Sequence, residues 1–232
     1  MFSWIKKWVD TMHDKEKKKE KYMQDRIKSF NDPIAWKTNF DSLVGWWSNI
    51  QTHTLQYDAF WNIVFKQHVL LWFIFLSVFL WVGWSILLPH LWDIIIHAED
   101  IHIIDIYSMG AWILFIIIWI IVFYLSTQNS KIFDFQNGYF YPLRYKKKFW
   151  ENIHNNRIKG KIAKISDIYA LQIIKKRVRS NRDIYDSYEL NIVLKNTDRI
   201  NVINHGVSYI IREDAQEIVD KLRVPVWDVS GI

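Results

Sequence analysis

Two uninterrupted apolar runs stand out along the chain. Residues 69–89 contain no ionisable side chain, and residues 108–126 form a second uncharged run. At about 1.5 Å per residue, these runs would make helices of about 31 and about 28 Å, close to the thickness of a bilayer core. The pattern therefore predicts two transmembrane helices joined by a connection at residues 90–107.

The distribution of basic residues predicts an orientation for these spans. None of the 30 lysines and arginines lies between Lys66 and Lys131. Because positive charge favours the cytoplasmic side, we expect both termini in the cytoplasm and the connection in the periplasm of a bacterial inner-membrane protein. Residues 1–68 have no apolar core of the kind a signal peptide carries, so we expect no cleaved leader.

The first residues show the spacing of an amphipathic helix. The apolar positions are Phe2, Ile5, Val9 and Met12, with Trp4 and Trp8 beside them. Indole rings favour the lipid headgroup zone and lysines meet anionic lipid, so Trp4 and Trp8 predict a membrane-surface helix. The alternative is a helix packed on the rest of the protein or on another subunit. Residues 51–65 suggest a strand hairpin that joins the C-terminal domain, although their periodicity is poor.

Residues 131–232 change to the alternation of strands. Asn137-Gly138 between two short apolar runs predicts a hairpin, and residues 168–178 and 188–195 are typical of further strands. Residues 208–222 follow with helical spacing. We therefore expect a small cytoplasmic antiparallel β-barrel or curved sheet capped by one helix. The fold class predicted for the whole chain is an α+β membrane protein.

This order of strands and one helix resembles a pleckstrin-homology-like (PH-like) domain. Short stretches of the chain also resemble a group of uncharacterised proteobacterial two-span membrane proteins. These stretches are Asp32-Pro33, Thr52-His53, Gly138-Tyr139-Phe140, Ala170-Leu171-Gln172, residues 188–194, residues 199–202, His205-Gly206, Asp214-Ala215 and residues 224–228. The resemblance implies two spans with a C-terminal PH-like domain and carries no assigned activity. Where that group is expected to have an Asp-Gly turn, Asn196-Thr197-Asp198 predicts a longer loop.

The candidate chemistry is sparse. The chain has no cysteine, which excludes disulfides, thiolate zinc sites and a cysteine nucleophile. No phosphate-binding loop and no nucleophile elbow occurs. His205 and Ser208 lie near aspartates such as Asp214, but they are more typical of a turn and a helix cap than of a hydrolase triad. Glu189 and Asn191 are expected on the solvent face of a strand. We therefore predict no enzyme activity and no cofactor.

The connection between the two apolar runs is rich in histidine and carboxylate. Asp93, His97 and His102 are weak candidates for a metal site, because imidazole and carboxylate suit divalent ions. The two histidines are five positions apart, whereas helical zinc motifs place them four apart. We therefore expect no metal and interpret this stretch as a short helix on the outer membrane surface.

Two basic clusters are candidates for an anionic-lipid surface. They contain Lys146, Lys147, Lys148, Lys175, Lys176, Arg177 and Arg179. Each cation would contribute about 1 kcal/mol beside an anionic leaflet. The alternative is that they are solvated strand ends. No nucleic-acid-binding motif accompanies the net charge of +6, so we expect no nucleic-acid partner.

Together these features predict a non-catalytic inner-membrane protein that binds a protein partner. Its expected partners are membrane lipid and either another protein or further copies of itself. A narrower version is an immunity-type protein that blocks a membrane-acting toxin. The alternative is a ligand-sensing membrane effector, whose β-domain binds a nucleotide or lipid and whose oligomerised spans act on the membrane.

Overall fold

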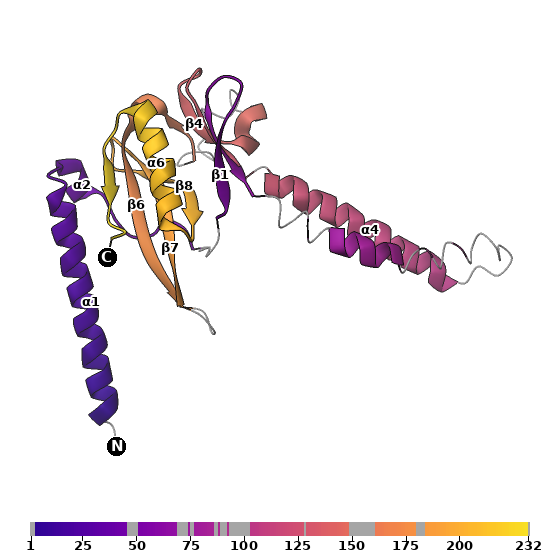
Figure 1. Ribbon diagram of the computed structural model, residues 1–232, viewed down its shortest axis with the longest axis horizontal. Helices are drawn as coiled ribbons and strands as arrows, with labels where there is room; N and C mark the ends of the chain where they lie inside the picture. Colours follow the sequence, from indigo (N-terminus) through magenta and orange to yellow (C-terminus); the bar gives the residue numbers. More distant parts are fainter. Residues whose placement is uncertain are drawn as a thin grey trace. The chain divides into compact units, whose positions relative to one another are not determined.

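The chain folds into two compact units. The computed structural model describes residues 3–45, 51–68, 74, 77–85, 88, 92, 103–127, 129–148, 161–179 and 184–231. The first unit joins Met1–Phe65 to Lys131–Ile232, and the second is Lys66–Ser130. Segments from both ends of the chain therefore build one unit (Figure 1).

The first unit contains two sheets. One has the order β1-β2-β3-β4-β5, formed by His53–Tyr57, Ile63–Gln67, Lys131–Asp134, Tyr139–Pro142 and Ala163–Lys164. The other has the order β8-β7-β6-β9, formed by Arg199–His205, Ile184–Leu194, Ile168–Arg179 and Val226–Asp228. Strand β9 is parallel to β6, whereas β6, β7 and β8 are antiparallel. The sheets are separate and neither closes on itself, so the predicted closed or single curved sheet is wrong.

An apolar core lies between the two sheets and helix α6 (Ser208–Leu222). Alternate residues of β6 and β7, such as Leu171 and Leu190, are fully buried in it. Ile211 and Ile218 bring the apolar stripe of α6 onto the same core. The helix expected at residues 208–222 is confirmed, and Figure 1 shows it lying across the four-stranded sheet.

The N-terminal helices cover the other face of the four-stranded sheet. Helix α1 (Ser3–Ser29) is followed at once by the short helix α2 (Pro33–Lys37). The Asp32 side chain caps α2 by accepting a hydrogen bond from the backbone N–H of Ile34 at 2.8 Å. Buried Ile27 and Trp227 belong to the cluster that joins these helices to the sheet. The hairpin expected at residues 51–65 is confirmed as β1 and β2, and β2 pairs with β3.

The second unit contains helix α4 (Ile103–Thr127). Phe79 packs against Phe115 and Trp119 of this helix, with ring centroids 5.8 and 6.1 Å apart. The six-membered ring of Trp112 fills the place that a β-carbon on Gly83 would take. Gly83 therefore permits close packing within this unit.

The structure contradicts the predicted membrane architecture. Among the residues it describes, no helix combines the length and the apolar character needed to cross a bilayer. The two-helix transmembrane hairpin at 69–89 and 108–126, and the inner-membrane location inferred from it, are therefore wrong. An uncharged run meets the composition of a span, but composition alone does not establish that the folded chain carries it as a membrane-crossing helix.

Candidate functional site

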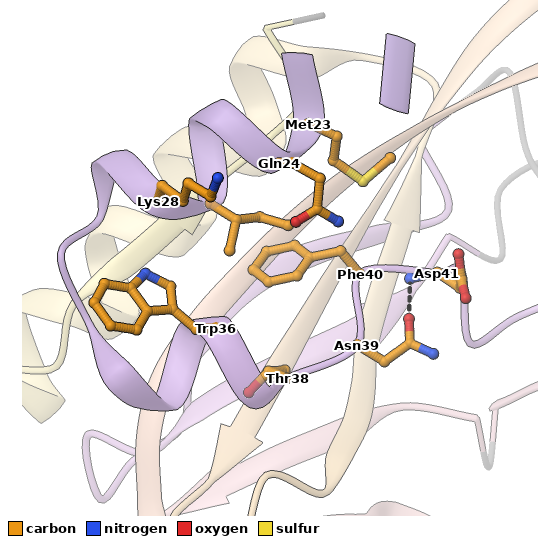
Figure 2. A pocket seen from close by; sticks show the side chains of 9 residues that line it. Met23, Gln24, Lys28, Trp36, Thr38, Asn39, Phe40 and Asp41 are labelled. Atoms are coloured by element: carbon orange, nitrogen blue, oxygen red, sulfur yellow. Dashed lines mark hydrogen bonds between the residues drawn. The ribbon is translucent and has the colours of Figure 1, made fainter. Parts of the chain in front are cut away.

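A groove lies between α1 and the chain that follows α2. Its volume is about 710 Å³. The lining residues are Met23, Gln24, Ile27, Lys28, Trp36, Thr38, Asn39, Phe40 and Asp41. Figure 2 shows the side chains of α1 on one side and those of residues 36–41 on the other.

The floor of the groove is apolar and its rim is polar. Ile27 and Phe40 are buried and also belong to the cluster beneath α1. Trp36 stands at one end with 54% of its surface exposed. Gln24 and Asn39 bring side-chain amides to the rim, and Asn39 accepts a hydrogen bond from the backbone N–H of Asp41 (Figure 2).

A buried carboxylate holds the chain just beyond this groove. Glu189 of β7 is fully buried, and one of its oxygens accepts a hydrogen bond from the backbone N–H of Leu43 at 3.1 Å. Its second oxygen accepts from the Ser42 hydroxyl at 3.1 Å. The expectation that Glu189 and Asn191 face solvent is wrong, because the N-terminal segment covers this face of the sheet and both are fully buried.

Two further side chains of the sheet hold the groove wall itself. The Gln172 amide donates to the backbone oxygen of Asn39 at 3.0 Å. Arg199 donates to the backbone oxygen of Asp41 at 2.6 Å and to the Gln172 side-chain oxygen at 3.1 Å. A buried polar group without a hydrogen-bond partner destabilises the folded protein. These paired contacts therefore fix residues 39–43 on the sheet.

The polar contacts continue across the sheet as a row of amides. Asn191 donates to the Gln172 side-chain oxygen at 3.3 Å, and Asn201 donates to Asn191 at 3.3 Å. Lys131 ends the row by donating to the Asn201 side-chain and backbone oxygens at 3.0 and 2.9 Å. Burial, aided by the positive charge of Arg144, lowers the pKa of Lys131 to about 8.

The buried histidine near α6 is engaged on both ring nitrogens. His205 Nδ1 accepts from the backbone N–H of Thr52 at 3.2 Å, which assigns the ring proton to Nε2. That nitrogen lies 3.3 Å from an Asp214 carboxylate oxygen. His205 is therefore not free to act as a base for Ser208. The expected Ser208 helix cap is wrong as well, because Val207 is the N-cap residue and it makes no side-chain cap bond.

The predicted metal candidates Asp93, His97 and His102 lie outside the described residues. Across the parts of the chain that are described, no three metal-binding side chains gather. The first basic cluster lies within the 3₁₀ helix Leu143–Lys148. The side chains of Lys146, Lys147 and Lys148 also lie outside what the structure describes.

The second basic cluster is partly neutralised. Lys175 and Arg177 both bind the Asp186 carboxylate, at 3.0 and 3.1 Å. Burial acts to raise the pKa of Asp186, but the hydrogen bonds from these two cations hold it below its usual value. Lys176 alternates to the opposite face of β6, and Arg179 is exposed near the strand end. By the same alternation, Lys175, Arg177 and Arg179 share one face of the strand, and an anionic-lipid surface at these clusters stays a prediction.

Sequence reasoning missed an exposed aromatic turn between β1 and β2. Phe60 and Trp61 are 62% and 70% exposed. The Asp58 carboxylate shapes the turn by accepting from the backbone N–H groups of Phe60 and Asn62, each at 2.9 Å. Trp61 has a φ of 62°, and the Lys221 ammonium lies 5.8 Å from the centre of its ring. The Asp58 turn chemistry was the signal available in the sequence.

Comparisons of this chain with protein-family models, with curated proteins and with solved structures found no match. The resemblance to two-span proteobacterial proteins stays a prediction.

Proposed function

We propose that this chain is a non-catalytic binding protein and that a segment of a partner polypeptide occupies the groove beside α1. The observation that carries the proposal is the 710 Å³ groove itself, whose apolar floor and amide rim are held in place from beneath. An immunity-type role, in which the bound polypeptide is a toxin, is a narrower form of this proposal.

The chemistry of the lining fits a polypeptide. Ile27 and Phe40 offer an apolar floor for a large side chain, which is the kind of contact that dominates binding energy at interfaces. Gln24 and Asn39 place amides where the backbone of a bound chain can form hydrogen bonds. Lys28 and Asp41 are the charged residues of the lining, and its other side chains are neutral.

The groove wall is also preorganised. Residues 39–43 are already ordered by Gln172, Glu189 and Arg199, so a partner need not order them on binding. Ordering a loop at the moment of association reduces affinity, and a wall fixed in advance avoids that cost.

The test is site-specific photocrosslinking in cells that produce the protein. A photoreactive amino acid replaces Trp36 at the groove, and in a matched variant it replaces Tyr209, which is 60% exposed on α6. We expect an adduct of polypeptide mass from position 36 and none from position 209, with the captured protein identified by mass spectrometry.

A second pair of variants tests the groove directly. Gln24→Trp fills it from an exposed position of α1, whereas Glu20→Trp lies one turn earlier and outside the lining. We expect Gln24→Trp to abolish the adduct and Glu20→Trp to leave it unchanged. An adduct that is absent, equal from both crosslinker positions, or insensitive to Gln24→Trp would contradict the proposal.

A further inference from the structure

Among the residues that the structure describes, the C-terminal end of helix α1 is the part that packs against the sheet. The helix has 27 residues and is about 40 Å long. Met23, Ile27 and Phe30, near its C-terminal end, join the cluster that contains Trp227. In Figure 1 this end meets α2 beside the sheet, while the N-terminal part continues away from them.

The unpacked part of α1 keeps the apolar stripe of the packed part. Trp4 and Trp8 are 69% and 58% exposed. Ile5 and Val9, which lie beside them, are exposed as well. Spacings of three and four residues place these side chains on neighbouring positions of one helix face. An exposed apolar patch of this kind marks an interaction surface.

Charge decides which occupant fits this stripe. Helix α1 carries nine lysines and arginines against five aspartates and glutamates. Lys6 and Lys7 lie among the exposed tryptophans, and a lysine-rich stretch follows at residues 15–21. A second copy would bring the same excess of positive charge, whereas an anionic surface is complementary to it.

We propose that the N-terminal part of α1 binds the surface of an anionic lipid layer, with Trp4 and Trp8 at the level of the headgroups. Tryptophan favours that level, and a helix with an apolar stripe and flanking lysines lies in the plane of such a surface without crossing it. The contact needs no spanning helix. It is also independent of the groove, which is lined by the other end of α1.

The absence of cysteine allows a local readout on the full chain. Val9→Cys, labelled with the fluorophore nitrobenzoxadiazole, reports the environment of the stripe, and labelled Tyr209→Cys on α6 is the matched control. With vesicles of phosphatidylcholine and phosphatidylglycerol, we expect brighter, blue-shifted emission from position 9 only. Vesicles of phosphatidylcholine alone, or added salt, should weaken the change, because screening reduces the attraction.

Substitutions then separate the contribution of the lysine charges from that of the tryptophan rings. Lys6→Glu with Lys7→Glu, and separately Trp4→Ser with Trp8→Ser, are each expected to raise the lipid concentration at half-maximal change by about tenfold or more. Trp36→Ser removes an exposed tryptophan at the groove and should have no effect here. The proposed function is tested separately, by the effect of Gln24→Trp on the crosslinked adduct.

Three results would overturn the lipid proposal. The first is no change at position 9, and the second is an equal change with neutral and anionic vesicles. The third is a change that follows protein concentration without vesicles and accompanies a dimer in analytical ultracentrifugation. That last result would identify a second copy as the occupant.

Discussion

Glu189 holds the N-terminal segment on the sheet through both carboxylate oxygens, although its position in the strand pattern predicts exposure. Its partners are the backbone N–H of Leu43 and the Ser42 hydroxyl. Replacing Glu189 by Ala leaves that N–H unpaired where water is scarce. We expect the free energy of unfolding, measured with urea, to fall by about 3 kcal/mol.

The matched control for this change is Glu189→Gln. It keeps an acceptor oxygen of similar shape, so we expect a clearly smaller loss than with alanine. Faster hydrogen exchange at the Leu43 amide should accompany only the alanine variant. Equal stability of wild type and Glu189→Ala would show that residues 42–43 are not held in this way.

Lys131 makes stability depend on pH in a direction that its pKa determines. Burial lowers this pKa from 10.5 to about 8, so between these values the unfolded chain binds more protons than the folded chain. The free energy of unfolding contributed by Lys131 should therefore rise with pH across this window, by at most about 3 kcal/mol. Comparing urea unfolding of wild type and Lys131→Met from about pH 7 to about pH 10 isolates this term. Parallel pH profiles would contradict the prediction.

At the scale of elements, local chemistry predicted the turns and strands well. The hairpin at Asn137-Gly138 is confirmed, with Gly138 at a φ of 74° and four residues rather than two between β3 and β4. The longer loop at Asn196-Thr197-Asp198 is also confirmed, with Thr197 at a φ of 70°. Such turns depend on residues close in sequence, which is why they could be predicted.

Contacts between distant elements could not be predicted in the same way. The alternation along β7 separates two faces of the strand, but both faces are buried, one by α6 and the other by residues of the N-terminal segment. The groove forms where α1 meets residues 36–41, and the buried side chains that hold its wall come from β6, β7 and β8. No periodicity within one element contains that information.

Trp227 is the element-scale link between β9 and the N-terminal helices. It is 1% exposed, and its ring lies 6.4 Å from Phe30, 6.2 Å from Phe40 and 6.0 Å from Tyr169. Trp227→Ala should lower the free energy of unfolding by about 3–5 kcal/mol, because it leaves a cavity among these rings. We also expect earlier proteolytic cleavage within α1.

The control for that change is Trp36→Ala, which removes the same side chain from an exposed position. Its effect on stability should stay within about 0.5 kcal/mol. If the two variants lose similar stability, the ring cluster does not hold α1 on the sheet.

At the scale of the whole molecule, composition was the misleading signal. The uncharged runs and the absence of cations between Lys66 and Lys131 predicted a membrane hairpin, whereas no described helix is able to cross a bilayer. The structure shows instead that Lys66–Ser130 is a separate unit, inserted in the sequence between β2 and β3, which pair with each other in one sheet. Composition describes what a segment contains and does not report where the folded chain places it.

The pairing of β2 with β3 makes this insertion testable. Phe65 pairs with Lys131 and Ile63 with Phe133, so the strands that flank the inserted unit are direct antiparallel neighbours. Neighbours of this kind can be joined by a two-residue turn. We expect a chain in which Asn-Gly replaces residues 68–128 to fold as the first unit, with one cooperative urea transition and the pH dependence of Lys131 retained.

The register provides a stringent control for this design. Extending the observed pairs brings residue 67 opposite residue 129, which is where the Asn-Gly turn would close. Replacing residues 68–129 instead shortens the connection by one residue. Residue 67 would then face residue 130, and the shift would turn buried Phe133 away from the core face. We expect this second chain to unfold at lower urea or without cooperativity. If both chains fold equally well, the β2–β3 register does not hold the first unit together, and the strands that flank the insertion do not depend on each other.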